Sequence, residues 1–299
     1  NRGQLELTDG RDEFGASSTF WLEPSDGGVV WIGDRWYRGK VKLVPSDNGV
    51  TAVNYVNVDD YLYSVVGSEM PSSWPQEALR SQAVAARSYA LYQQRKASGK
   101  PFDLNSNQSS QVYKGLAGEA ASTQSAVDAT RGKVLTHGGR VIEAVFHSSS
   151  GGHTENSEHV WSTAVPYLKG VPDFDQNAPV YSWRAQFSLH EVGDLIGYPG
   201  SIEAVEVLSR SPQGRAKRMT IIGDAGTLTM TGNTFRQKLG LRSTKFDLAV
   251  SPTSISVAGN GFGHGIGMSQ WGARGMAERG KGYDEILTHF YKGTRLGSM

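Results

Sequence analysis

One long run of helix-forming residues, from Trp74 to Gly99, constrains the fold more than any other feature of this chain. Its apolar positions, Leu79 and Ala83 among them, recur at the spacing of one helix face. The pattern predicts a single long helix that ends at Gly99, where glycine terminates helices well. The apolar face is rich in alanine, so a neighbouring element can pack closely against it.

The rest of the chain is interpreted as short strands and turns with a few shorter helices. Runs of β-branched and aromatic residues predict strands at 19–22, 29–32, 40–44, 51–56, 133–136, 141–146 and 255–258. The apolar run 61–66 is interpreted as strand-like too. Helices are expected at 123–131 and, as the final element, from about Ser269. We therefore predict an α+β fold, a β-rich body whose long helix lines a cleft.

A change of pattern marks residues 176–255 as a smaller α+β domain. Alternating strands are predicted at 204–209, 218–222 and 227–230, with helical patterns at 187–195 and 234–239. The predicted domains are a main domain of residues 1–175 and 256–299 and an inserted domain of residues 176–255.

Composition excludes several classes of function. Lys and Arg number 30 and Asp and Glu 29, so a net charge of +1 offers no field that attracts nucleic acid or anionic lipid. No stretch approaches the roughly 18 consecutive apolar residues of a membrane-spanning helix. The absence of cysteine excludes disulfides, thiolate metal sites and cysteine nucleophiles. With 299 residues, the chain can bury a core without such cross-links.

Glu69 is the first candidate for catalysis, because it follows the strand-like run and precedes the long helix. Catalytic side chains concentrate in loops held between rigid elements. Met70, Pro71 and Trp74 would supply an apolar wall that keeps a carboxylic acid protonated, as a general acid requires. The alternative is an ordinary carboxylate at a helix start that interacts with the helix dipole.

Arg80 and Arg87 are expected on one face of the long helix, since seven residues are close to two turns. Together they could hold a polyhydroxyl ligand or pair with an acid, and the alternative is a solvated helix face. An arginine close to Glu69 would lower the pKa of that carboxyl group and oppose its role as an acid.

Residues 146–155 (FHSSSGGHTE) combine histidine, serine and glycine. The nucleophile pattern Gly-x-Ser-x-Gly is absent, which argues against acyl transfer. The spacing of His147, His153 and His159 matches no common metal-ligand pattern. We favour a loop shaped by glycine whose Ser and His side chains contact a ligand.

Glycine alternates with other residues in 259–273 (GNGFGHGIGMSQWGA). Such loops can bind phosphate at a helix start, but the lysine of a nucleotide-binding loop is missing. We favour a loop that packs closely beside a cleft and presents His264, Gln270 and Trp271. The start of the long helix, the segment 147–153 and this loop are expected to form that cleft.

These blocks resemble the stage II sporulation protein D family, which also contains amidase-enhancer proteins. The resemblance covers most of residues 40–295, with the blocks in family order. They are YLYSVVGSEMP (61–71), WP (74–75), EAL (77–79), QAVAARSYA (82–90), QVYKG (111–115), HSSSGG (147–152), YLKG (167–170) and GFGHGIGMSQWG (261–272).

The resemblance implies a peptidoglycan lytic transglycosylase. Glu69 matches the family's catalytic acid, Arg87 matches an active-site arginine, and Arg80 lies where a basic residue is usual. Tyr167 and Lys169 match a family Tyr-x-Lys element. One carboxylate protonates the glycosidic oxygen and then acts as base, so that the 6-hydroxyl of N-acetylmuramic acid attacks C1 and an anhydro sugar forms. Ordinary glycosidases use two carboxylates.

A hydrolase would require a second carboxylate, such as Asp59 or Asp60. These two are close to Glu69 in sequence, but no other feature of the sequence indicates a catalytic role for them. The side chains expected to contact the glycan are Arg80, Arg87, Tyr113, His147, Ser148, Tyr167, Lys169, His264 and Gln270. Some family members bind zinc through cysteines near the His-Ser segment, and because this chain has none, no metal and no cofactor is expected.

The resemblance also implies partners and a location. Glycan strands of peptidoglycan are the expected substrate, and other wall hydrolases such as an amidase are expected partners. The alternative function is a non-catalytic glycan-binding module that stimulates an amidase. Since peptidoglycan lies in the cell envelope, the resemblance implies an exported protein of that compartment. The chain begins at Asn1 with no leader pattern, so a targeting segment is expected to be removed or omitted.

Overall fold

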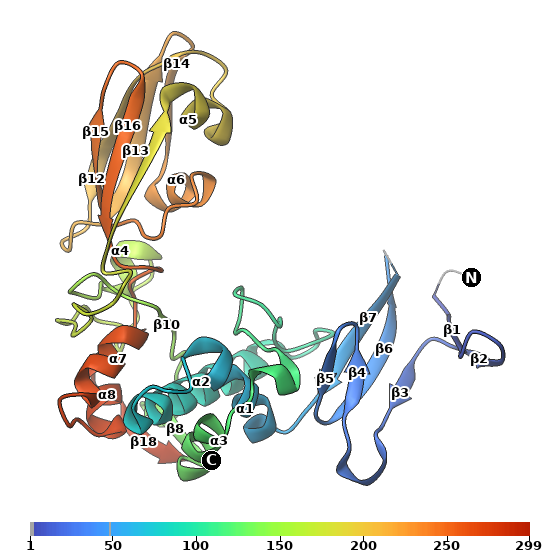
Figure 1. The fold of residues 1–299 in the computed structure, drawn as a ribbon. Helices are drawn as coiled ribbons and strands as arrows, with labels where there is room; N and C mark the ends of the chain where they lie inside the picture. Colours follow the sequence, from blue (N-terminus) through green and yellow to red (C-terminus); the bar gives the residue numbers. More distant parts are fainter. Residues whose placement is uncertain (1–2, 48) are drawn as a thin grey trace. The chain divides into compact units, whose positions relative to one another are not determined.

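The computed structural model describes residues 3–47 and 49–299 and divides the chain into two compact units (Figure 1). Unit 1 is formed by Asn1–Val134, Val141–Glu143 and Gly297–Met299, and unit 2 by Leu135–Arg140 and Ala144–Leu296. Helices and strands are both abundant in the described residues, which confirms the predicted α+β class.

Unit 1 begins with three small antiparallel sheets, β1-β2, β3-β6-β7 and β4-β5. Their strands are β1 (Leu5–Thr8), β2 (Glu13–Ser17), β3 (Phe20–Leu22), β4 (Val30–Ile32), β5 (Arg35–Tyr37), β6 (Lys40–Ser46) and β7 (Gly49–Tyr55). Four of them confirm the strands predicted from β-branched and aromatic runs between residues 19 and 56.

Helix α1 (Val58–Glu69) replaces the strand predicted at 61–66, and this prediction was wrong. The side chain of Asn57 caps the helix by accepting the backbone N–H of Asp59 at 2.9 Å. Asp59 and Asp60 lie in the first turn, where acidic side chains favour a helix. A short apolar run fits a buried helix as well as a strand, and here the cap and the acidic turn decide.

Helix α2 (Gln76–Lys96) confirms the predicted long helix and packs against α1 and α3 (Ala121–Ala129) (Figure 1). Its alanines Ala83, Ala86 and Ala90 are buried, so the neighbouring helices approach closely. A further sheet has the order β18-β8-β9, formed by β18 (Arg295–Ser298), β8 (Lys133–His137) and β9 (Arg140–Val141).

Unit 2 contains two three-stranded sheets, β11-β16-β15 and β12-β13-β14, and one two-stranded parallel pair, β10-β17. The strands are β10 (Phe146–His147), β11 (Ser182–Ser188), β12 (Ile202–Arg210), β13 (Ala216–Gly223), β14 (Gly226–Thr231), β15 (Phe246–Val250), β16 (Ser254–Asn260) and β17 (Met268–Ser269). The helices are α4 (Ser157–Val160), α5 (Leu189–Ile196), α6 (Gly232–Lys238), α7 (Gln270–Ala277) and α8 (Tyr283–Phe290).

The two three-stranded sheets share a hydrophobic core with α5 and α6. Val192 of α5, Phe235 of α6, Met219 of β13 and Val257 of β16 are buried in this cluster. All of its fully buried members lie between residues 183 and 257. Apart from Val257, which lies two residues beyond the predicted end, the cluster falls within the region predicted as an inserted domain, and the boundaries at 176 and 255 stay predictions.

The C-terminal part forms two helices where one was expected. Gly280 has a left-handed φ of +78° between α7 and α8, which ends the first helix, and Gly282 precedes the second. Among the described helices, none combines the length and the apolar character needed to cross a membrane.

Candidate functional site

Glu69 is the last residue of α1, and α2 begins only at Gln76. Met70 ends the helix with an extended backbone, as expected of a residue followed by proline. The alternative that Glu69 is a carboxylate at the start of the long helix is therefore wrong. Met70 and Trp74 are buried beside it in sequence, whereas Pro71 is exposed.

One oxygen of the half-buried Glu69 carboxylate is held by the backbone. Oε1 accepts the N–H of Val112 at 3.0 Å, across 43 residues of chain. Burial raises the pKa of Tyr61, and Tyr113 and the charge of Glu69 add to this rise. Two of the sequence blocks, 61–71 and 111–115, are thus brought together around Glu69.

Tyr113, expected to bind glycan, lies next to Val112 and is largely buried. Its ring packs against Tyr61 at 4.8 Å and Tyr37 at 5.4 Å between centroids. Its hydroxyl donates to Oδ1 of Asn54 at 2.8 Å. Tyr113 is therefore fixed between α1 and the N-terminal strands.

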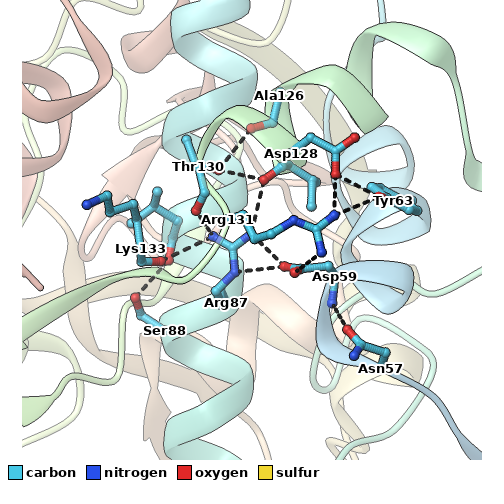
Figure 2. A network of polar contacts seen from close by, with 12 residues as sticks. Asn57, Asp59, Tyr63, Arg87, Ser88, Ala126, Asp128, Thr130, Arg131 and Lys133 are labelled. Atoms are coloured by element: carbon cyan, nitrogen blue, oxygen red, sulfur yellow. Dashed lines mark hydrogen bonds and ion pairs between the residues drawn. The ribbon is translucent and has the colours of Figure 1, made fainter. Parts of the chain in front are cut away.

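Arg87, the second expected site residue, is fully buried within unit 1 (Figure 2). Its Nε and Nη2 donate to Oδ1 of Asp59 at 3.2 and 2.9 Å. Its Nη1 donates to the backbone oxygens of Thr130 and Lys133 at 2.8 and 3.1 Å. The guanidinium joins α1 and α2 to the segment after α3, and it has no exposed surface with which to contact a glycan directly.

Asp59 is engaged by a second cation as well. Arg131 Nη1 lies 3.4 Å from Asp59 Oδ2, and Arg131 Nη2 lies 2.7 Å from Oδ1 of Asp128 (Figure 2). Asp59 and Glu69 are ten residues apart on α1, so their Cα atoms are about 15 Å apart. Both carboxylate oxygens of Asp59 are engaged by arginines, and its Cα lies far from that of Glu69 compared with the roughly 5–9.5 Å between paired glycosidase carboxyl groups, so Asp59 does not fit as a second catalytic acid.

Arg80 differs from Arg87, although the sequence placed them on one face. Its side chain is one-third exposed and pairs with Glu77 at 2.6 Å, one turn earlier on α2. The two arginines differ because α1 and α3 cover the middle of α2, where Arg87 lies. Arg80 is accordingly the one of the pair that a ligand can reach.

In unit 2, the His-Ser segment and the glycine loop are joined. Strands β10 and β17 pair Phe146 with Met268 and His147 with Ser269. Gly263 in the loop has a left-handed φ of +112°, and a Cβ there would lie 2.8 Å from Cβ of His147. This position therefore requires glycine, both for its backbone and for the approach to His147.

His147 and His264 pack together at 5.1 Å between ring centroids, and the exposed Trp161 lies 5.2 Å from His264. Nδ1 of His147 lies 3.1 Å from the oxygen of Ile266, and Ile266 N–H donates to Nδ1 of His264 at 3.0 Å. Burial lowers the pKa of both, for His264 to about 4. Both rings are neutral at pH 7.

Two aspartates that the sequence analysis missed organise this segment. Asp175 accepts the N–H groups of Gly151 and Gly152 at 2.8 and 2.9 Å, and Asp173 accepts the hydroxyl of Ser150. Burial and the charge of Asp175 raise the pKa of Asp173 to about 7. The signal that could have revealed them is an Asp-x-Asp pair that begins three residues after the block 167–170.

Arg215 adds a buried cation to this cluster. Its Nη2 donates to the backbone oxygen of Ser150 at 2.9 Å, while Nε and Nη1 have no hydrogen-bond partner among the described residues. Burial lowers its pKa to about 10. A buried arginine and two aspartates thus fix the backbone that carries His147 and Ser148.

The remaining expected site residues belong to unit 2 as well. Lys169 pairs with Glu158 at 3.0 Å, and the half-buried Tyr167 lies 5.6 Å from the ring of His137. Ser148 accepts the backbone N–H of Trp271 at 3.0 Å through its own backbone oxygen. The buried Gln270 is the first residue of α7.

The expected residues therefore form two groups. Unit 1 holds Glu69, Arg80, Arg87 and Tyr113, and unit 2 holds His147, Ser148, Tyr167, Lys169, His264 and Gln270. Over residues 3–47 and 49–299, no group of three or more His, Asp or Glu side chains is arranged to hold a metal ion.

Two family models match parts of this chain. The family model described as stage II sporulation protein matches residues 46–137, which include Glu69 and the α1–α3 core. A second model, described only as a domain of unknown function (DUF8618), matches residues 162–267.

Relatives extend this match over most of the chain. An uncharacterised protein of Brachyspira hyodysenteriae is 38% identical, over 87% of this chain and 72% of the relative. Stage II sporulation protein D of Bacillus subtilis is 35% identical, over 82% of this chain and 76% of the relative. The amidase enhancer of B. subtilis is 30% identical, over 79% of this chain and 40% of the relative. The chain belongs to the stage II sporulation protein D family.

Proposed function

We propose that this protein is a peptidoglycan lytic transglycosylase in which Glu69 is the general acid and base. The observation that supports the proposal is the position of Glu69. Its carboxylate ends a capped, buried helix and is fixed by the Val112 N–H of another sequence block. Such fixation suits a group that must deliver a proton at one defined place.

The proposed reaction needs one carboxyl group. Protonated Glu69 gives its proton to the glycosidic oxygen while the bond from C1 of N-acetylmuramic acid to that oxygen breaks. The carboxylate then removes the proton of the C6 hydroxyl, whose oxygen attacks C1. The products are a strand end with a free hydroxyl and a 1,6-anhydro sugar, and Glu69 is protonated again.

The other expected residues divide by exposure. Arg80, Tyr167 and Lys169 are partly exposed, and we assign them to glycan contact together with Ser148 and His264. Arg87 acts as a positioning residue, because its donors go to Asp59 and to backbone oxygens. Three of the expected residues are largely buried, so each would contact the glycan with only one edge of its side chain: His147, Gln270 and Tyr113.

We further propose that the protein acts in the cell envelope, where its substrate lies, after export. The second candidate function is a non-catalytic module that binds glycan and stimulates a wall amidase. The 30% identical relative named amidase enhancer favours this alternative. An amidase is the expected partner under both proposals.

The product of digestion tests the proposal. The purified chain is incubated with sacculi and, separately, with glycan strands stripped of stem peptides, and the products are analysed by mass spectrometry. Sugar ends that lack one water and resist borohydride reduction are expected. The alternative would be established by two results together: glycan binding without such ends, and amide cleavage by a purified amidase that is faster with this chain than without it.

A further inference from the structure

A pocket of about 620 Å³ lies in unit 1, and among its described lining residues Tyr113 is the one already expected to contact glycan. Strand β7, the start of α1 and the segment 100–106 after α2 form its walls. Its volume falls within the range of roughly 300–1,000 Å³ typical of small-ligand sites. Glu69 does not line it, although Tyr61 and Tyr113 do.

Five aromatic side chains are among the described residues that line the pocket. Tyr55 and Phe102 are 43% and 39% exposed, so a ligand can reach both rings. Behind them, Tyr37, Tyr61 and Tyr113 form the packed cluster described above. Sugar rings present apolar C–H faces, so such a surface suits a carbohydrate.

The polar part of the lining is neutral overall. Among the described residues that line the pocket, Lys100 and Asp103 carry charge, and these two balance. The other polar groups are amides and hydroxyls, including Gln94, Asn105 and Ser106. Amides and hydroxyls pair with sugar hydroxyls and acetamido groups, whereas a phosphate or acidic peptide would need excess positive charge.

The aromatic surface continues beyond the pocket. Tyr55 also lines a second hollow of about 370 Å³, where Arg38 and Lys40 are balanced by Glu23 and Asp60. The ring of Trp21, 44% exposed, packs on Tyr55 at 4.7 Å. Two neutral hollows that share one aromatic residue fit an extended polymer better than a single small molecule.

The pocket is rigidly connected to Glu69. Tyr61 and Glu69 are eight residues apart on α1, a rise of about 12 Å. Tyr113 follows Val112, whose N–H holds the carboxylate. A ligand on the tyrosines therefore lies at a fixed distance from the proposed acid.

We propose that this pocket, with Tyr55 and Phe102 as its contact residues, is an accessory glycan subsite that holds sugars of the same strand away from the bond to be cleaved. The inference rests on the proposed function for its ligand class. Both contact residues lie within residues 46–137, which the family model matches, whereas Ile32 and Tyr37 of the lining precede that match.

Binding to the Glu69→Gln protein tests the subsite without turnover. The probe is stem-peptide-free glycan strands, measured by calorimetry with Tyr55→Ala, Phe102→Ala and the matched control Phe14→Ala. Phe14 is 61% exposed on β2 and lines neither hollow. We expect the first two changes to weaken binding about tenfold, or about 1.4 kcal/mol, and the control to leave it unchanged. All melting temperatures should stay close to that of the parent.

In the active chain, the same two variants should raise KM for long strands and preserve kcat. Unchanged affinity and KM would overturn the subsite, as would an equal loss in Phe14→Ala. The proposed function fails separately: if no anhydro ends form but binding still depends on Tyr55 and Phe102, the subsite stands and the reaction does not. If anhydro ends form with a normal KM in both variants, the reaction stands and the subsite is wrong.

Discussion

Replacing Glu69 by Gln keeps the shape of the side chain and removes the proton that the proposed reaction needs. General acid catalysis contributes roughly 10²–10⁴-fold in rate, so Glu69→Gln should lose at least that factor in the release of anhydro ends. The amide oxygen can still accept the N–H of Val112, so folding should be preserved. Initial rates on sacculi measure the effect.

Glu206→Gln is the matched control, because Glu206 is exposed on β12 in unit 2. It should cleave like the wild type. Normal turnover in Glu69→Gln would show that Glu69 is not the general acid.

Arg87 and Arg80 should differ strongly in their effect on stability. Arg87→Ala leaves Asp59 buried beside the more distant Arg131 and should cost about 3–5 kcal/mol in the free energy of unfolding. Arg80→Ala breaks a partly exposed pair with Glu77 and should cost less than about 1 kcal/mol. Urea unfolding measures both. Equal costs would show that the buried network does not hold the helices together.

Asp173 should make the stability of the protein depend on pH. Its pKa is raised from 3.8 to about 7 in the folded chain. The folded state therefore keeps a proton that the unfolded chain releases, so this stabilisation is present below about pH 4 and is lost as the pH rises toward 7. Asp173→Asn should flatten this fall in melting temperature between pH 4 and 7. Asp284→Asn, an exposed control on α8, should leave it unchanged.

Single residues show where sequence reasoning was sufficient and where it failed. Glu69 could be found because its block is local and continuous. The burial of Arg87 could not be predicted, since helix periodicity places a residue on a face but does not say which part of the face is covered. Asp173 and Asp175 were missed because their partners, Ser150 and the two glycines, lie more than 20 residues away.

At the scale of elements, length decided which predictions succeeded. Helix α2 has 21 residues, enough for its composition and periodicity to identify it. Helix α1 was missed because only its apolar middle was considered, and the cap at Asn57 was not. The strands of residues 19–56, except β5, and those of residues 202–231 were predicted because β-branched runs alternate with turn residues there.

The glycine loop before α7 offers a test with an internal control. Gly263 and Gly226 both have a left-handed φ, +112° and +98°, so alanine is strained at both. Only at Gly263 would the new methyl group meet Cβ of His147, while nothing lies within 4 Å at Gly226. Gly226→Ala should cost about 1 kcal/mol and Gly263→Ala about 1–3 kcal/mol more, measured by denaturant unfolding. Equal costs would contradict the close contact.

At the scale of the whole molecule, the α+β class and the family followed from the sequence, because ordered blocks over most of the chain are specific. The arrangement of unit 2 did not follow, since it depends on strands paired across the inserted region. The alternating pattern of a strand indicates which face is buried, but it does not say which distant strand is its partner, as for β11 and β16.

Cleavage by the whole protein should survive chelation. No group of three or more His, Asp or Glu side chains in the described part of the chain is placed to hold an ion, and cysteine is absent. EDTA treatment followed by dialysis should leave the rate of anhydro-end release unchanged. A loss that zinc restores would contradict this expectation.

The pairing of β10 with β17 has a consequence for the order of folding. Phe146 and His264 contact each other across 118 residues, so closing this loop in an unfolded chain would be entropically expensive. Strands β11 and β16 pair Ser182 with Asn260 and shorten the remaining loop to about forty residues, which saves about 1 kcal/mol. During synthesis on the ribosome, β10 cannot pair with β17 until β17 has emerged. The β10-β17 pair, which includes His147, is therefore among the last structures that unit 2 acquires.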